Sequence, residues 1–423
     1  MREPKAPKIA ELRNDKTLGI DFAGMPVDPV PKGEPYEEAL KATEGIIVTA
    51  GIWYMYQGGE ERDQTRDRFG SGAAFGGLNI SQAIEFLYRL GVEGVSFHYP
   101  GEYGEDNAAI IDQVLAERGM ALASAAANTF SYPIFSKGGP CNNDPKIREL
   151  ALLLNMRAQE INVAHGRAFQ TDWAGRDASA GHFFDRASEK WNWTREVYVK
   201  NVLSVSGKCG YAIEFKPYDP GERAIMADVN GALRMCYEVE DTIREILVDL
   251  YGPEAGLKNF EENYRGCMGV NIEDAHVYLL KGHQTVADAV DLALNAGRYF
   301  LRHPNDAIVS DTDDILGKYH ILDAIETAYV ELSYGYNGPY EPDILPKDDD
   351  RLAAMICSIN QVNRMRAVAR ELLEDDKWAR RFQEARKSEC SSKMIDFLDD
   401  FMNRNVPYPK IPLKLADQFR KDL

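Results

Sequence analysis

The sequence contains no cysteines in the paired spacing of a zinc or redox motif. Its six cysteines are scattered over 423 residues, and no two of them stand in a CxxC pattern. In a chain of this length, such cysteines are typical of reduced thiols, so we expect a cytoplasmic protein without disulfides. Structural zinc usually requires a set of thiolate ligands, and we therefore do not predict it.

Long apolar runs, an excess of basic charge and a phosphate-binding loop are also missing. No stretch reaches the ~20 apolar residues of a membrane-spanning helix. Acidic residues outnumber basic ones by 67 to 49, and the formal net charge is −18. This charge argues against nucleic acid or an anionic membrane surface as a partner. The glycine-rich segment 69–77 lacks the glycine spacing of a nucleotide-binding loop.

What the sequence does contain is a steady alternation of strand-like and helix-like segments. Residues 1–44 are rich in proline and charge and show no period, so we expect an extended N-terminal arm there. Between residues 45 and 345 apolar segments alternate with amphipathic ones, and the first predicted strand spans 46–56. From 346 to 423 the pattern is that of a C-terminal helical arm, and its apolar stripe over 352–372 is typical of a packing face. The alternation predicts βαβ units and a parallel sheet, either closed or open.

Two charged residues lie inside a short apolar segment, Tyr-Ala-Ile-Glu-Phe-Lys-Pro, at 211–217. Side chains two residues apart on a strand point to the same face, so Glu214 and Lys216 share one side of the sheet or the mouth of a barrel. Charged groups are rarely buried unless they are paired or bind a metal. Taken alone, the segment favours a structural ion pair slightly over a catalytic one. The polar residues at the ends of the other strands reverse that order.

Acidic, amide and histidine residues recur near the ends of the later predicted strands. With Glu214 included, the set consists of Glu214, Glu273, His276, Asn305, Asp311, Asp313 and Asp343. Carboxylates with few imidazoles form an oxygen-rich site suited to Mg²⁺ or Mn²⁺. Any one of these residues is better explained singly, as a solvated loop acid or a hydrogen-bonded histidine. Their order along the chain predicts the site, because the carboxyl ends of barrel strands meet at one mouth.

Several of these segments resemble the xylose isomerase family. Glu-Phe-Lys-Pro at 214–217 is similar to that family's metal-ligand and catalytic-lysine strand. Gly-Val-Asn-Ile-Glu-Asp-Ala-His at 269–276 is similar to its bridging glutamate and histidine, and Asp-Thr-Asp at 311–313 to its paired aspartates. Gly-Pro at 338–339, followed by Asp343, is similar to the strand that carries the last carboxylate. The similar segments keep the family's order.

Other segments resemble the family's sugar pocket. Phe-His at 97–98 resembles the strand end whose histidine, here His98, binds the sugar, and the segments 128–139 and 173–177 resemble aromatic walls. In the family, the phenylalanine of the first loop reaches into a neighbouring subunit's site. The resemblance therefore implies substrate contacts from Trp53, Phe75, Phe135, Trp173 and Asn128.

The resemblance, which runs from about residue 47 to residue 345, implies an α/β fold, the (β/α)8 barrel. It also implies a sugar isomerase that binds two divalent cations per subunit, Mg²⁺, Mn²⁺ or Co²⁺. Such an enzyme interconverts an aldose and a ketose by a metal-assisted hydride shift, and Lys216 would stabilise charge on O1. Together with the two arms, the resemblance implies a homo-oligomer, a dimer or a tetramer, whose partner is a small sugar.

Two positions depart from the family's pattern. After His98 a run of aspartates is replaced by Tyr-Pro-Gly-Glu, so Glu102 stands one residue late for the carboxylate that orients the histidine. Asn305 stands where the family has an aspartate ligand, with His303 and Asp306 as alternatives. These departures favour a modified or branched sugar over xylose as the substrate.

Two other functions stay open on the sequence. A metal-dependent epimerase or lyase acting on a modified sugar or sugar conjugate would use the same barrel and abstract a proton. It would need a base such as Glu102, His98 or His303. A non-catalytic sugar-binding relative would have no need of Lys216 between two metal sites, which argues against a pure binder.

Overall fold

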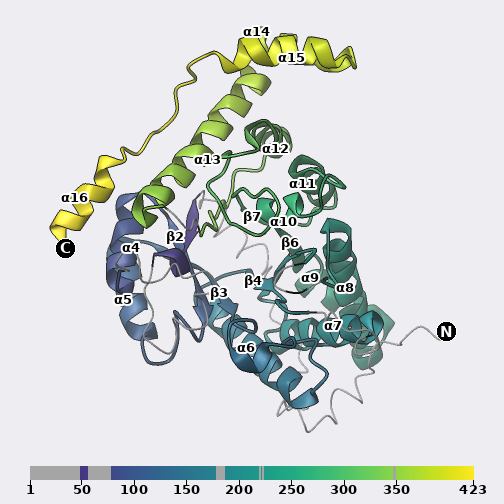
Figure 1. The fold of residues 1–423 in the computed structure, drawn as a ribbon. Coiled ribbons are helices and arrows are strands. Elements are labelled where there is room, and N and C mark those ends of the chain that lie inside the picture. The colour runs from purple at the N-terminus through teal and green to yellow at the C-terminus, as the bar shows by residue number, and fades with distance from the viewer. Residues whose placement is uncertain (1–47, 56–77, 178–185, 219–220, 222, 346–348) are drawn as a thin grey trace.

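Strands and helices alternate along the chain and form a barrel surrounded by helices (Figure 1). The computed structural model describes residues 48–55, 78–177, 186–218, 221, 223–345 and 349–423. The strands are β1 (Thr49–Gly51), β2 (Gly94–Tyr99), β3 (Ala121–Ala127), β4 (Phe169–Trp173), β5 (Gly210–Glu214), β6 (Met268–Glu273) and β7 (Tyr299–His303). The predicted α/β, (β/α)8 barrel fold is confirmed.

All strand pairs are parallel, and they form two sheets in the orders β1-β2-β3 and β4-β5-β6-β7. Tyr340 takes the place of the eighth strand, because it bridges Val48 on one side and Arg302 on the other. Among the described strands no backbone ladder joins β3 to β4. A side chain spans this seam instead, where the Thr171 amide donates to Ser124 Oγ at 3.1 Å.

Helices cover the outside of the barrel. They are α4 (Ile80–Arg89), α5 (Ala108–Arg118), α6 (Pro145–Ala164), α7 (Ala187–Ser204), α8 (Val229–Tyr251), α9 (Pro253–Asn263), α10 (Asp274–Tyr278), α11 (Val286–Asn295) and α12 (Ile321–Ser333). Local signals start several of them: Asn79 and Gln82 form a capping box at α4, and Asp144 caps α6 with Pro145 in its first turn.

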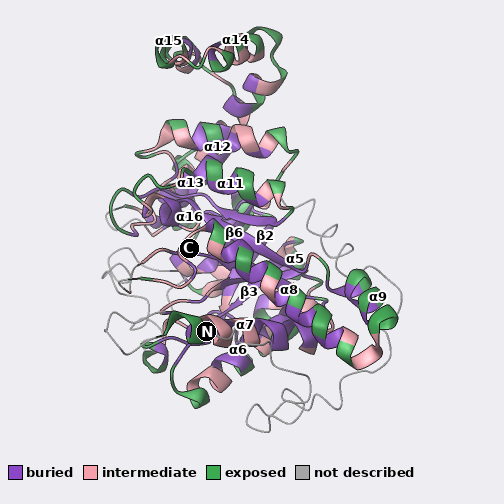
Figure 2. Cartoon of the chain, turned by 90° about the vertical axis from the view of Figure 1, so that its right-hand side faces the viewer, coloured by how far each residue is buried: buried purple, intermediate pink, exposed green. Residues whose placement is uncertain are grey.

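The C-terminal residues form four more helices, α13 (Arg351–Glu374), α14 (Asp376–Lys387), α15 (Ser391–Met402) and α16 (Lys414–Asp422). The apolar stripe of α13 is buried, as expected of a packing face. Helices α14 and α15 extend away from the barrel (Figures 1 and 2), whereas α16 returns to α4 (Figure 1). There the rings of Phe86 and Phe419 lie 5.0 Å apart. The predicted N-terminal arm over 1–44 lies outside the described residues, and the predicted domain boundaries stay predictions.

The first strand is shorter than predicted. Of the predicted span 46–56, the described part is a strand only over Thr49–Gly51, and a 3-10 helix, η3 (Ile52–Tyr54), follows at once. The reason is a tertiary contact. A Cβ on Gly51 would stand 2.2 Å from the Trp53 ring, so the glycine allows the indole to fold back over the strand end. The prediction of a longer strand was wrong, because the apolar pattern of the sequence gives no indication of this turn.

Alternation along the strands sorts side chains between the barrel interior and the helices. On β5, Tyr211 and Ile213 belong to the core shared with the outer helices, whereas Ala212 packs with the barrel residues Phe169 and Leu301. Glu214 follows two residues after Ala212, on the inward face. The same period carries the inward face of β6 to Glu273, so the two carboxylates reach the barrel mouth together.

A buried ion network fixes the outer side of β6 and β7. Arg302 donates two hydrogen bonds to Asp274, at 2.9 and 2.6 Å, and a third to Glu331 at 3.1 Å. The Tyr299 hydroxyl donates to Glu331 at 2.6 Å. Because Asp274 directly follows Glu273, this network also fixes the backbone at one edge of the barrel mouth.

We expect Arg302→Met to lower the free energy of unfolding by about 3–5 kcal/mol, because it leaves two buried carboxylates without their cation. Arg265→Met is the matched control, since Arg265 pairs with Glu261 through side chains that are 66% and 47% exposed. It should change stability little. Urea titrations followed by far-UV circular dichroism measure both. Equal losses of unfolding free energy in the two variants would show that the buried network stabilises the fold no more than the exposed ion pair does.

Candidate metal and sugar site

Side chains from three neighbouring strand ends meet at the barrel mouth. His303, the last residue of β7, places Nδ1 at 3.1 Å from Glu214 Oε2, 3.7 Å from Glu273 Oε2 and 3.6 Å from Asp343 Oδ2. Asn271 on β6 donates to Glu214 Oε2 at 2.8 Å and holds that carboxylate in place. All of these side chains except Asp343 are buried.

A second group of ligand atoms lies next to the first. His276 on α10 places Nε2 at 3.4 Å from Glu273 Oε2 and 3.5 Å from Asp311 Oδ1. Asp313 stands two residues further on and takes a left-handed backbone conformation, with φ of 45°. Aspartate tolerates that region better than most residues, and the turn brings its carboxylate toward the cluster.

Glu273 is shared by three sets of atoms that are spaced to hold a cation. The sets are Glu214, Glu273 and His276; Glu273, His303 and Asp343; and Glu273, Asp311 and Asp313, each with its ligand atoms within 4.8 Å of one another. The seven predicted metal residues therefore converge, and six of them offer a ligand atom. His303, which we considered only as an alternative, offers another.

The cluster is crowded with negative charge. Burial, together with the charges of Asp311 and Glu273, raises the pKa of Asp313 well above its usual value. Burial and Glu273 likewise raise the pKa of Asp343 to about 6. Burial alone would lower the pKa of His303, but its contact with Glu214 reverses the effect and raises that pKa well above its usual range. These shifts show a site that favours added positive charge.

Five buried atoms of the possible ligand residues have no hydrogen-bond partner within the described part of the chain. They are His276 Nδ1, His303 Nδ1, His303 Nε2, Asp311 Oδ1 and Asp313 Oδ1. Buried polar groups are otherwise hydrogen-bonded in native proteins, so each such atom requires an explanation. Carboxylate oxygens and imidazole nitrogens that converge and lack partners suit Mg²⁺, Mn²⁺ or Co²⁺, so the residues present fit a divalent metal centre.

Asn305 faces the cluster with its amide nitrogen. Its Nδ2 donates to Glu273 Oε1 and to the Asp343 carbonyl oxygen, both at 2.8 Å, while its Oδ1 accepts from the Ala275 amide at 2.8 Å. The backbone donor fixes which atom is oxygen, because a flipped amide would bring two N–H groups together. In this arrangement Asn305 orients Glu273, and its predicted role as a ligand stays a prediction.

Asp306, the other alternative, is engaged elsewhere. Its carboxylate accepts from the Tyr319 and His320 amides at 2.8 and 3.0 Å, and it lies 2.6 Å from His320 Nδ1. Two backbone hydrogen bonds also join Asp306 to Asp314. Asp306 thereby closes the loop that carries Asp311 and Asp313.

Lys216 lies just beyond the end of β5, with 5% of its surface exposed. Its ammonium donates to Asp311 and lies over the Trp173 ring, 4.8 Å from the centroid. Burial acts to lower its pKa, but Asp311, Asp313 and Glu273 outweigh burial and raise it. Lys216 is therefore a permanent ammonium between the carboxylates and an aromatic wall.

On the opposite side of the mouth, His98 is held by Glu102. His98 Nδ1 lies 2.9 Å from Glu102 Oε2, and the same oxygen accepts the His98 backbone amide at 2.6 Å. Glu102 is only 3% exposed, whereas the His98 ring reaches the surface of the mouth. The carboxylate that stands one residue late in the sequence thus reaches the histidine.

Aromatic rings link the two sides. The Trp53 ring lies 4.6 Å from His98, and its Nε1 donates to Asp343 Oδ1 at 2.7 Å. Phe130 lies 5.2 Å from His98 and 4.8 Å from Trp173. These rings form an apolar wall that starts at the histidine and ends at the Lys216 side.

The remaining predicted pocket residues lie less centrally or outside the described residues. Phe135 is buried in the 3-10 helix η4 (Pro133–Phe135), and Asn128 uses Oδ1 to accept from the Ser131 amide at 3.0 Å. Phe75 lies outside the described residues. The sequence analysis did not single out Phe130, although that residue lies within the segment 128–139 that resembles an aromatic wall, and it did not single out Asn271. Asn271 stands two residues before Glu273 on the same strand face, so the two-residue period of the strand could have identified it as a site residue.

No family model matches the chain. Xylose isomerase from Thermus thermophilus is 25% identical over 305 residues, which cover 69% of this chain and 70% of that protein. The chain is a divergent relative of the xylose isomerases. A solved structure of L-ribulose 3-epimerase superposes with a TM-score of 0.53 at 11% identity, covering 78% of this chain and 98% of that one. That likeness shows the barrel fold alone.

Two further features bear on this xylose isomerase-like chain. No helix within the described ranges has both the length and the apolar content of a membrane crossing. All six cysteines are free thiols, and four of them are buried. The expected cytoplasmic location and homo-oligomeric state stay predictions.

We expect the protein to melt at a higher temperature with Mn²⁺ than after treatment with EDTA, because a cation that binds only the folded state stabilises it. At a free concentration of 100 Kd the gain is about 2.7 kcal/mol. Glu273→Gln should lose most of the Mn²⁺-dependent gain, since Glu273 belongs to all three ligand sets. Glu371→Gln, whose carboxylate pairs with Arg404 on the C-terminal helices, should keep it. An unchanged gain in Glu273→Gln would overturn the assignment of the metal centre.

Proposed function

We propose that this chain is a sugar isomerase that interconverts an aldose and a ketose by a hydride shift between neighbouring carbons. The observation that carries the proposal is Lys216, a buried ammonium placed between the cation-binding carboxylates and the Trp173 ring. A purely structural ion pair would not require the ammonium to lie both beside the possible metal ligands and against an aromatic ring. A sugar oxygen that gains negative charge during the reaction is the partner that this position suits.

The ligand residues divide into two overlapping groups. Glu214, Glu273, His303 and Asp343 would hold one divalent cation, and Glu273, His276, Asp311 and Asp313 a second. When bound, the cations supply Lewis acidity that polarises the C–O bonds of the sugar. Asn271 keeps the Glu214 carboxylate in place, and Asn305 the shared Glu273 carboxylate, each through a hydrogen bond of 2.8 Å.

The protein's own residues prepare the substrate and shield it. His98, held through Nδ1 by Glu102, would move a proton at the ring oxygen of a cyclic sugar and so open it. Lys216 then stabilises charge on the carbonyl oxygen of the open chain. The rings of Trp53, Phe130 and Trp173 line the path between these two groups and exclude water from the reacting carbons, which disfavours a competing route by proton transfer.

One observation favours a second candidate function. The His98–Glu102 pair is also the arrangement of a general base, a histidine oriented by a buried carboxylate. If this pair abstracted a proton next to the carbonyl, the same site would act as an epimerase or a lyase. The two functions differ in whether hydrogen from solvent enters the product.

We expect Lys216→Ala to lower kcat by about 100-fold or more, because it removes the group that stabilises developing charge. Lys200→Met is the matched control. Lys200 is equally buried but pairs with Glu196 on α7. It should lose stability and keep kcat. A Lys216→Ala protein that melts at a lower temperature yet turns over normally would show that Lys216 is only a structural partner of Asp311.

We expect the product formed in D₂O to carry no carbon-bound deuterium from solvent. The experiment incubates a panel of aldoses and ketoses with the Mg²⁺-loaded enzyme and follows the C1 and C2 positions by NMR. A shielded hydride shift keeps the substrate's own hydrogen, whereas proton abstraction by His98 exchanges it with solvent. Deuterium at one carbon per turnover would reject the isomerase mechanism and favour the second candidate.

A further inference from the structure

The His303 imidazole has an unusual environment, because neither ring nitrogen has a hydrogen-bond partner in the described part of the chain although the residue is 2% exposed. Nδ1 faces the carboxylates of the mouth, with Glu214 Oε2 closest at 3.1 Å. Nε2 points the other way, toward the barrel interior, and lies 3.4 Å from Glu341 Oε1. A buried imidazole placed in this way is spaced for one partner on each side.

Glu341 lies next to the possible metal ligands, on the side of the barrel interior. It is 1% exposed and stands two residues before Asp343, and its backbone amide donates to the Arg302 oxygen at 2.9 Å. Its Oε2 accepts from the Thr49 hydroxyl at 2.8 Å and from the Ser96 hydroxyl at 2.5 Å. These two hydroxyls, from β1 and β2, fix the carboxylate, so that Oε1 is left to face His303.

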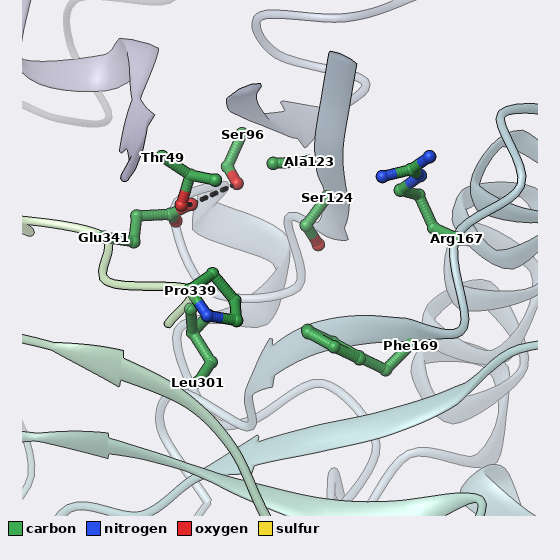
Figure 3. Close-up of a pocket in the computed structure, with 9 residues that line it drawn as sticks. All are labelled: Thr49, Ser96, Ala123, Ser124, Arg167, Phe169, Leu301, Pro339 and Glu341. Carbon is green, nitrogen blue, oxygen red and sulfur yellow. Dashed lines mark hydrogen bonds between the residues drawn. The ribbon is translucent and has the colours of Figure 1, made fainter. Parts of the chain in front are cut away.

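A small cavity lies beneath this carboxylate, between the two sheets, at the seam that no backbone ladder closes within the described strands. Figure 3 shows Glu341 on one wall with Thr49 and Ser96, and Arg167 on the opposite side. Arg167 donates its Nε to the His165 carbonyl oxygen at 3.0 Å. Glu341 is therefore held by the barrel wall and turned toward the metal centre.

We propose that Glu341 is a positioning residue for His303, which it holds with Nδ1 toward the first cation while supplying negative charge behind the ring. The inference rests on the proposed function, because it assumes that His303 binds a divalent cation. A carboxylate that accepts from the distal nitrogen of a ligating histidine fixes the orientation of the ring and increases its basicity. Here the carboxylate also compensates for Asn305, which brings no charge to the cluster.

The test measures Mn²⁺ binding by isothermal titration calorimetry rather than turnover. We expect two Mn²⁺ sites in the wild-type protein and about a tenfold or greater loss of affinity at one of them in Glu341→Gln, which keeps the shape but removes the charge. The second site, which includes Asp311 and Asp313, should keep its affinity. Ser96→Ala retains the carboxylate and removes one of the hydroxyls that fix it, so a smaller loss at the same site is expected.

Glu240→Gln is the control for a buried carboxylate without contact to the metal centre. Glu240 is 5% exposed and pairs with Arg298 through two hydrogen bonds, at 2.5 and 2.8 Å. This variant should melt at a lower temperature and bind both Mn²⁺ ions as the wild type does. A loss of Mn²⁺ affinity in Glu240→Gln equal to that in Glu341→Gln would show that the effect arises from general destabilisation, which overturns the positioning role.

A double-mutant cycle with His303→Ala tests whether Glu341 acts through His303. In the His303→Ala background, Glu341→Gln should change Mn²⁺ affinity by less than about twofold. A full additional loss in that background would overturn the positioning role, because Glu341 would then act without the imidazole. Wild-type affinity in both Glu341→Gln and Ser96→Ala would overturn it while leaving the proposed function standing. Absence of Mn²⁺ binding by the wild type would instead reject the proposed function, and the positioning role with it.

Discussion

Mutual repulsion among closely placed carboxylates, of which Glu214, Glu273 and Asp311 are buried, is the constraint on which this site depends. Glu214, Glu273, Asp311, Asp313 and Asp343 crowd one end of the barrel, and at ~4 Å two like charges near a protein surface repel by about 4 kcal/mol. Within the described residues, one lysine lies among them and is paired with Asp311. The fold holds the carboxylates together by means that do not neutralise them, which leaves the charge available for cations.

The interactions that hold the carboxylates together lie outside the barrel mouth. On the outer face of the barrel, Arg302 joins Asp274 to Glu331 and so fixes the ends of β6 and β7. At the rim, Asp306 closes its loop through Asp314 and His320. Apart from Lys216, which pairs with Asp311, the cations named here lie away from the ligand carboxylates, so one set of acids stabilises the fold while the other can bind metal.

The sequence predicted the parts of this arrangement that depend on local signals. Local signals fix the ends of α5 and α6, because Gly119 ends the first in the left-handed region and Asp144 caps the second. The strand period placed Glu214 and Glu273 on the inward face. The orientation of the Asn305 side-chain amide could not be predicted from the sequence, because it is set by the backbone amide of Ala275, 30 residues away in the chain. The role of Phe130 likewise depends on contacts with two distant strands.

The two departures from the xylose isomerase pattern have one feature in common. In each case a carboxylate from a different position in the sequence lies close to the site. Glu102 is one residue late, but the turn in which its amide bonds to the His98 oxygen at 2.8 Å brings the carboxylate back to the ring. Asn305 is neutral, yet a buried acid stands behind the neighbouring imidazole. Motif comparison records residue types at fixed positions, so it does not detect a carboxylate that reaches the same site from a neighbouring position. No family model matches the chain, yet its acidic and histidine residues still form groups that could hold a metal ion.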